Sequence, residues 1–248
     1  MPKQILRFIL QSCTWLAIAT SANAGIYVDK VEHPKKVVIF KIQGKISHTD
    51  VSAFQNALNG IKNDGYKIKL NSVVLDSIGG SGTAAVAIGK IIRKEKLNTY
   101  VGPKHNCASA CVFILSSGII RMAYGKVSVH RGTLYEDYPI ENLEESLKTL
   151  DTEMLNHLFE MGMATQLIDA IRVTPFWTVW TLDDKEKRRW GVHGTERYYE
   201  ELWFRTTASA KQYEISNVKY FFYKHFDKCT KMAREFKMTV FECVKNEM

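Results

Sequence analysis

The stretch SVVLDSIGGSGTAAVAIGKIIRKEK, residues 72–96, decides the fold class of this chain. Its first residues are β-branched or apolar and predict a buried strand over 72–76, which runs into Gly79 and Gly80. Beyond the glycines, apolar side chains recur every three or four residues, which is the pattern of an amphipathic helix. A strand, a glycine turn and a helix in this order are typical of α/β proteins with a parallel-rich sheet.

The segments on either side repeat this alternation of strands and helices. The run VVIFKIQGKI is almost continuously apolar and is typical of a buried strand. The run ASACVFILSS is apolar on all sides and predicts a buried helix. The expected core elements are strands at 37–46, 72–76, 98–101, 119–123 and 126–130, with helices at 48–64, 84–96 and 108–117.

In the C-terminal part of the chain strands and helices no longer alternate, and the sequence predicts mainly helices. Leucines and methionines form one stripe over residues 142–172, followed by an aromatic stretch over 176–180 and a charged helix that stops at Gly191. Residues 205–248 carry few turn signals and predict a helical appendage packed on the core. We therefore expect an α/β domain over 25–204 and an appendage beyond it.

The first 24 residues have the pattern of a secretory signal. Lys3 and Arg7 precede an apolar run over residues 8–19, and the small residues Ala22 and Ala24 suit a cleavage site. An uncleaved anchor is the alternative, but this apolar run is short against the roughly 20 residues that span a bilayer. We expect a mature protein that is periplasmic or secreted and has no stable membrane anchor.

Composition places the chain among globular proteins of moderately basic charge. Its 248 residues are 46% apolar and 24% charged, which suits a folded core and rules out disorder. The net charge is +8, but the basic residues are spread along the chain, and the one dense run, residues 185–189, has acids beside it. That run is typical of a solvated helix face, so we expect no nucleic-acid partner.

Four cysteines remain after the signal, and an even number suits disulfides in an oxidising compartment. On one unbroken helix Cys229 and Cys243 would lie about 21 Å apart, too far for a bridge. The lack of Gly or Pro between them favours that single helix, whereas the export signal favours a bridged helical hairpin, which we expect. Cys107 and Cys111 suit a disulfide or small buried side chains.

A zinc site is the alternative for the first cysteine pair. His105, Cys107 and Cys111 could supply three ligands and His130 a fourth. In an exported protein a disulfide is the commoner outcome for such a pair. We expect neither a metal nor a cofactor.

Three short motifs could carry chemistry: the glycine pair, CASAC at 107–111, and His130 at the end of an expected strand. Ser109 would stand at the first turn of a buried helix, where unpaired N–H groups can hold an oxyanion and a serine can act as nucleophile. A serine there can also simply cap the helix. Local sequence leaves both readings open.

The ordered motifs LDSIGG, CASAC and SVHRG resemble the Clp protease proteolytic subunit (ClpP) family and its exported relatives, within the superfamily of the crotonases. The resemblance covers roughly residues 37–195 and implies a ClpP/crotonase-like α/β core of repeated β-β-α units. It also implies a serine peptidase that can form homo-oligomers and acts on a peptide or protein. By resemblance, Ser109 is the nucleophile, His130 the base, and Gly79, Gly80 and Ala110 the oxyanion hole.

The sequence departs from the family at the third catalytic position, because His193 and Gly194 stand where an aspartate is expected. Loss of an orienting carboxylate slows serine hydrolases without abolishing them. The role could pass to a backbone carbonyl, to His193 or to another acid, and the candidates by residue type are Asp137, Asp169, Asp183 and Asp184. The expected function is an exported serine hydrolase, and the alternative is a non-catalytic binding protein on the same core.

Overall fold

The computed structural model describes residues 25–31, 37–64, 72–132, 143–234 and 240–248, so the expected signal segment lies outside the described residues. The strands are β1 (Gly25–Val31), β2 (Val37–Ile46), β3 (Ser72–Gly80), β4 (Asn98–Val101), β5 (Asn106–Ala108), β6 (Ile120–Ala123), β7 (Lys126–Val129), β8 (Trp180–Thr181) and β9 (Gly194–Thr195). The helices are α1 (Thr49–Asn63), α2 (Gly82–Lys94), α3 (Cys111–Ser116), α4 (Leu143–Glu160), α5 (Thr165–Val173), α6 (Asp184–Arg189), α7 (Arg197–Lys211), α8 (Ile215–Arg234) and α9 (Val240–Glu247).

The sheet is mostly parallel and divides along β3. The strand order is β8-β7-β5-β3-β4-β6-β9, with β2 also paired to β3 and β1 to β2. The first residues of β3 pair with β4, whereas Ser77 pairs with Cys107 of β5. The antiparallel pairs involve outer strands: β1 with β2, β6 with β9, and β7 with β8. This division brings the ends of β3, β5 and β7 together.

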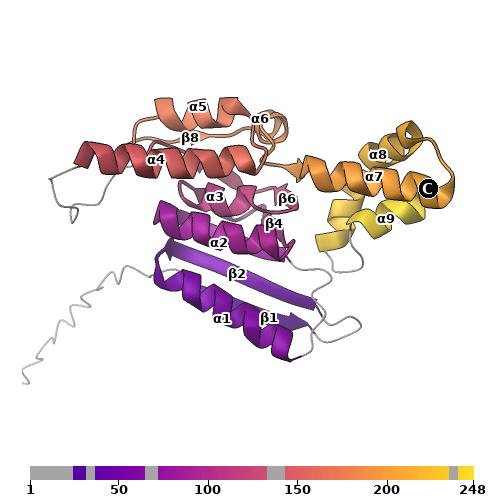
Figure 1. The fold of residues 1–248 in the computed structure, drawn as a ribbon, viewed down its shortest axis with the longest axis horizontal. Coiled ribbons are helices and arrows are strands. Elements are labelled where there is room, and N and C mark those ends of the chain that lie inside the picture. Colours follow the sequence, from indigo (N-terminus) through magenta and orange to yellow (C-terminus); the bar gives the residue numbers. More distant parts are fainter. Residues whose placement is uncertain (1–24, 32–36, 65–71, 133–142, 235–239) are drawn as a thin grey trace, which may run out of the picture.

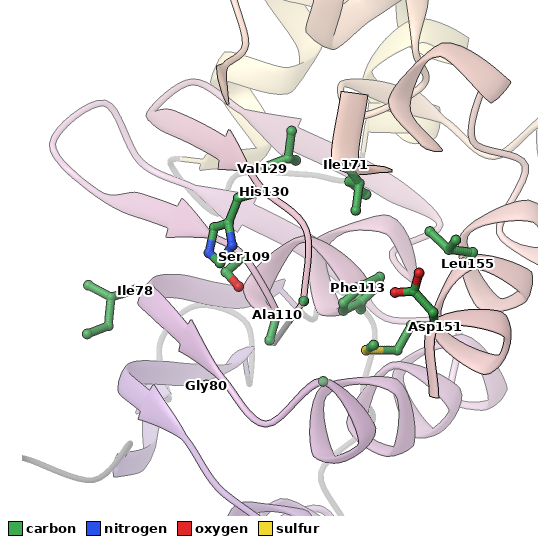
Figure 2. A pocket seen from close by; sticks show the side chains of 13 residues that line it. Ile78, Gly80, Ser109, Ala110, Phe113, Val129, His130, Asp151, Leu155 and Ile171 are labelled. Carbon is green, nitrogen blue, oxygen red and sulfur yellow. The ribbon is translucent and has the colours of Figure 1, made fainter. Parts of the chain in front are cut away.

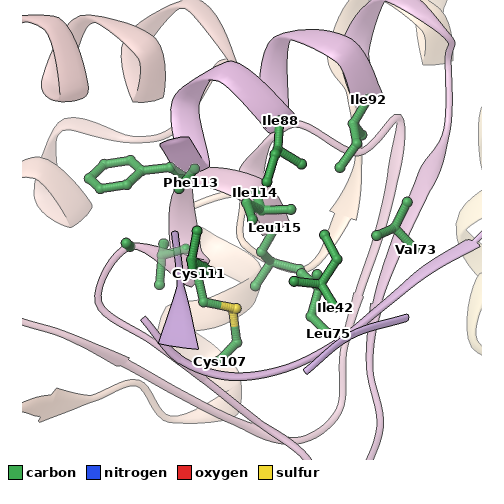
Figure 3. Packing of buried hydrophobic residues seen from close by; sticks show 14 of the residues in the cluster. Ile42, Val73, Leu75, Ile88, Ile92, Cys107, Cys111, Phe113, Ile114 and Leu115 are labelled. Carbon is green, nitrogen blue, oxygen red and sulfur yellow. A yellow bond between two sulfur atoms is a disulfide. The ribbon is translucent and has the colours of Figure 1, made fainter. Parts of the chain in front are cut away.

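The element order and the mostly parallel sheet confirm the expected mixed α/β core followed by C-terminal helices. Helices α1 to α5 are layered on the strands (Figure 1). The main hydrophobic cluster includes Ile42 and Leu75 from the sheet and Ile88, Ile114 and Leu115 from α2 and α3 (Figure 3). In β2 and β3 buried and more exposed side chains alternate, so that Ile42 and Leu75 face the core whereas Gln43 and Ile78 are exposed.

The C-terminal helices α7 to α9 extend from one end of the core and have a hydrophobic cluster of their own (Figure 1). Phe204 and Phe222 pack there against Ile120 and Met122 of β6. The Cys229–Cys243 disulfide joins α8 to α9, which confirms the helical hairpin rather than a single helix. The expected domain boundary at residue 205 falls within α7.

Local structure differs from the sequence prediction in several places. The strands β1, β5, β8 and β9 were not predicted. The helix expected at 108–117 begins only at Cys111, because β5 occupies residues 106–108. The helical stretch expected at 142–172 is two helices, since Gly162 has φ +75° between α4 and α5, a conformation that ends helices. Within the described ranges, no helix has the length and apolar character needed to cross a bilayer.

Candidate functional site

Ser109 stands between β5 and α3 in a conformation that few serines adopt. Its φ is +54°, in the left-handed region, which costs a non-glycine residue roughly 1–3 kcal/mol. Its N–H donates to the carbonyl of Ser128 on β7 at 2.9 Å. The N-cap of α3 is Ala110, and among the described residues none hydrogen-bonds the Ser109 hydroxyl, so the capping reading is wrong. A serine on a strained strand-to-helix turn presents its Oγ outward, as a nucleophile needs.

A disulfide closes the loop that carries this serine. Cys107 lies within β5, and Cys111 is the first residue of α3. A disulfide joins their sulfur atoms within the core (Figure 3). Ser109 is the middle residue of the five-residue loop that the bridge closes. Both cysteines are fully buried, so the disulfide anchors each side of the turn to the core. The zinc reading is therefore wrong for this pair, and no metal-ligand cluster occurs in the part of the chain that the structure describes.

Gly79 packs against Ser109 from the side of β3. Gly79 has φ +99°, and a Cβ there would lie 2.7 Å from Ser109 Cβ and 2.8 Å from the Ala108 carbonyl oxygen. Only glycine fits this position. Its N–H already donates to Ser77 Oγ at 3.1 Å. Gly80, with φ +141°, packs against the backbone of Ile46 and faces the cavity described below.

His130 follows the last residue of β7, which is the strand beside β5. Its Nδ1 lies 2.9 Å from the backbone carbonyl oxygen of Arg131. A carbonyl only accepts, so Nδ1 carries the proton and Nε2 is the basic nitrogen. The ring lies beside Ser109 (Figure 2), and in the described structure no hydrogen bond joins the two side chains.

Ser109 and His130 open into one cavity of about 190 Å³. Gly80 and Ala110 line it near the serine, and its far wall is apolar. The apolar wall consists of Phe113, Val129, Met154, Leu155 and Ile171. Asp151 of α4 lies at the end opposite His130 (Figure 2). This carboxylate is not among the residues expected from the sequence, although it lies four residues before Leu155 on the apolar stripe of its helix.

The acids expected near His130 lie elsewhere. Asp183 caps α6 by accepting the N–H of Glu186 at 2.7 Å, and Asp184 accepts from Lys187 Nζ at 3.0 Å. Asp169 is exposed on α5, and Asp137 lies outside the described residues. His193 lines a different cavity. The Arg131 carbonyl is therefore the group that orients His130 in this structure.

No protein-family model and no curated protein sequence matches this chain. Among solved structures, it is similar to a mutant of the 1510-N membrane-bound stomatin-specific protease, with 18% sequence identity and a TM-score of 0.47. The similarity covers 63% of this chain and 76% of that one.

A second serine and histidine are hydrogen-bonded in the interior. Ser117 Oγ lies 3.0 Å from His157 Nε2, and the two side chains are 0% and 1% exposed as residues. The Ser117 hydroxyl donates to the Phe113 carbonyl at 2.8 Å, and His157 Nε2 lies 3.1 Å from the same oxygen. Since the hydroxyl proton is used there, Nε2 is the protonated nitrogen of His157. Burial lowers the pKa of His157, which keeps the ring neutral.

Proposed function

We propose that the chain is a serine hydrolase, with Ser109 as nucleophile and His130 as general base. The observation that carries the proposal is the strained conformation of Ser109 at a cavity that also contains His130. Backbone strain at a polar residue persists only where surrounding structure enforces it, and it concentrates at functional sites. Here the disulfide, Gly79 and the hydrogen bond to Ser128 enforce it.

In the proposed reaction Ser109 Oγ attacks the carbonyl carbon of the substrate as its proton passes to His130 Nε2. This step requires a side-chain rotation that brings Oγ within about 2.6–3.2 Å of Nε2, because the hydrogen bond is not formed without substrate. The carbonyl oxygen becomes an oxyanion beside the N–H groups of Gly80 and Ala110. We assign Gly79 to positioning Ser109 instead, since its N–H is held by Ser77.

The tetrahedral intermediate then collapses, and His130 gives its proton to the leaving group. Water attacks the acyl-enzyme with His130 again as base, which releases the acid and restores Ser109. The backbone carbonyl of Arg131 is neutral, so it stabilises the protonated His130 ring less than a carboxylate would. We therefore expect slower hydrolysis than in enzymes with a complete Ser-His-Asp triad.

We assign peptides as the substrate class on the sequence resemblance to the Clp protease family, which is an analogy. The size of the cavity supports entry of one side chain, since about 190 Å³ is below the usual volume for larger ligands. The two disulfides indicate an oxidising, extracytoplasmic environment. A periplasmic or secreted location, cleavage after Ala24 and homo-oligomer formation belong to the same proposal.

The missing carboxylate favours a second candidate, a binding protein that uses the same cavity without hydrolysis. A fluorophosphonate probe separates the two, because it labels activated serines. We expect labelling of the wild type and of Ser117→Ala, and none of Ser109→Ala. Folded wild-type protein that is not labelled would support the binding protein. Labelling that survives in Ser109→Ala would contradict both readings of the site.

A further inference from the structure

Exposed apolar side chains are concentrated in one short segment between α5 and α6. Within residues 173–180, five large apolar side chains are 41–71% exposed, and they are Val173, Phe176, Trp177, Val179 and Trp180. None of them lines the Ser109 cavity. A cluster of exposed apolar side chains on a folded protein marks a contact with a membrane or with another protein. This segment is therefore a candidate docking surface.

Phe176 and Trp177 form the tip of a turn, here called the aromatic turn. The N–H of Thr178 donates to the carbonyl oxygen of Pro175 at 3.1 Å, so the two aromatic residues are the central pair of a β-turn. Their rings pack edge to face, with centroids 5.0 Å apart. Phe176 is 51% and Trp177 is 71% exposed, so the turn projects aromatic surface into solvent.

The ends of the aromatic turn are fixed to the core beside His130. Before the turn, the carbonyl oxygen of buried Thr174 accepts the N–H of Arg131 at 2.8 Å. After the turn, Trp180 pairs with Val129 at the end of β7. Val129, His130 and Arg131 are consecutive residues, so a surface that contacts the aromatic turn lies close to the Ser109 cavity.

Basic side chains flank the aromatic turn. Arg172 is exposed at the end of α5, Arg131 is exposed at the base of the turn, and Lys185 is exposed at the start of α6. Within the described residues these three cations form no ion pair. The whole chain has a net charge of +8, of which the signal segment supplies only the charges of Lys3 and Arg7. Both the flanks of the turn and the chain as a whole therefore attract an anionic surface.

The acids of the same region are mostly engaged within it. Asp183 and Glu186 form the capping box of α6, and Asp184 accepts from Lys187 Nζ at 3.0 Å. Asp169 of α5 is exposed and is outnumbered by the three flanking cations. The surface around the aromatic turn is therefore positive as well as apolar.

We propose that the aromatic turn docks the protein reversibly on an anionic lipid membrane. Phe176 and Trp177 enter the headgroup region, where aromatic rings are favoured, and Arg131, Arg172 and Lys185 face the lipid phosphates. Insertion removes from water apolar surface that the fold leaves exposed. A fluid lipid surface accepts a protruding pair of rings without a matching pocket, which a protein partner would have to supply.

The test uses the mature chain from Gly25 onward, so that the apolar run over residues 8–19 cannot contribute to binding. Cosedimentation measures binding to vesicles of phosphatidylcholine and phosphatidylglycerol in equal parts, with pure phosphatidylcholine vesicles as the neutral match. We expect binding to the mixed vesicles and at least about tenfold weaker binding to the neutral ones, because three cations face the lipid. Ser109→Ala should bind like the wild type, since docking does not use the proposed nucleophile, so this proposal and the hydrolase proposal fail separately.

Variants of exposed residues test the location of the contact without disturbing the core. Phe176→Ser combined with Trp177→Ser should weaken binding to the mixed vesicles by at least about tenfold, since both rings lose their burial in lipid. Tyr220→Ser, at a 60% exposed aromatic residue of α8, is the matched control and should change nothing. Arg172→Gln should weaken binding to the mixed vesicles by about fivefold and leave binding to the neutral ones unchanged.

Tryptophan fluorescence shows whether the turn enters the lipid. Vesicles with brominated acyl chains should quench the wild type more than Trp177→Phe, because bromine quenches tryptophans that reach the lipid. No binding to the mixed vesicles, equal binding to the neutral vesicles, undiminished binding of the double serine variant, or an equal loss in Tyr220→Ser would each overturn the proposal. Self-association that the double serine variant abolishes, without vesicle binding, would overturn it too and assign the turn to a second copy of the chain.

Discussion

Two serine–histidine pairs of the molecule, Ser109 with His130 and Ser117 with His157, differ in every property that matters for catalysis. Ser117 and His157 are hydrogen-bonded but sealed in the interior, whereas Ser109 and His130 share a cavity and are not hydrogen-bonded. The histidines also hold opposite tautomers, because a carbonyl accepts from Nε2 of His157 but from Nδ1 of His130. A short serine–histidine distance therefore does not identify a catalytic pair; access, strain and the free nitrogen do.

The largest effect should come from removing either member of the pair that opens into the cavity, Ser109 and His130, here called the open pair. Ser109→Ala and His130→Ala should each lower kcat/KM for peptide hydrolysis by about 10³-fold, and the double variant should lose little more. The loss is smaller than in full triads because the wild type lacks the carboxylate. Kinetics on a fluorogenic peptide measure it. Ser117→Ala should stay within a few-fold of wild type, and a comparable loss there would make the sealed pair the site.

The next effect concerns Gly79, which sets the position of the open serine. Gly79→Ala should lower kcat by about 100-fold, because the new methyl group collides with Ser109 Cβ and displaces the hydroxyl. It should also destabilise the fold, since alanine is strained at φ +99°.

Gly60 on α1 is the matched control, because a Cβ there meets nothing within 4 Å. Gly60→Ala should stabilise the protein by about 0.5–1 kcal/mol and leave kcat unchanged. Denaturant unfolding and kinetics on both variants give the comparison. An active Gly79→Ala enzyme would show that Ser109 does not depend on this packing.

The buried Ser117–His157 pair, here called the sealed pair, should make the free energy of unfolding depend on pH in the acid range. Burial lowers the folded-state pKa of His157 below the unfolded value of 6.5, so the unfolded chain binds the proton more readily. The free energy of unfolding should be highest above pH 6.5 and fall as the pH drops toward the folded-state pKa. His193, with a pKa of about 4, adds to this fall.

Urea unfolding between pH 7.5 and 4 measures this dependence. His157→Gln should flatten part of the slope, whereas Ser117→Ala should lower stability at all pH values and keep the slope. A His157→Gln protein with the full wild-type slope would mean that the pKa of His157 is the same in the folded and unfolded states.

Most of the fold could be predicted from the sequence because its strands are long or continuously apolar. The run over residues 37–46 is β2 with the same bounds, and the C-terminal hairpin followed from the cysteine count. The strand β5 could not be predicted, since its three residues gain their structure from pairing with β3 and β7. Propensity over so short a segment is weaker than tertiary pairing.

The candidate site was predicted by motif order rather than by local pattern. Ser109 reads locally as a helix cap, and only the left-handed φ in the structure separates a strained turn from a cap. Asp151 could have been predicted, because it is a carboxylate on the otherwise apolar stripe of α4.

The smallest effect should come from Asp151, which we expect to make the Ser109 cavity selective. Its carboxylate faces an otherwise apolar wall across from His130, so a substrate side chain with an aliphatic stem and a positive end fits (Figure 2). Peptides with lysine before the cleaved bond should be preferred over the same peptides with norleucine, which lacks only the amine. Asp151→Asn should reduce that preference by about fivefold, the worth of a partly exposed ion pair. Asp169→Asn on α5, outside the cavity, should leave the kcat/KM ratio unchanged. An unchanged lysine-to-norleucine ratio in Asp151→Asn would place the substrate side chain elsewhere, and the open pair would then have no electrostatic selectivity of its own.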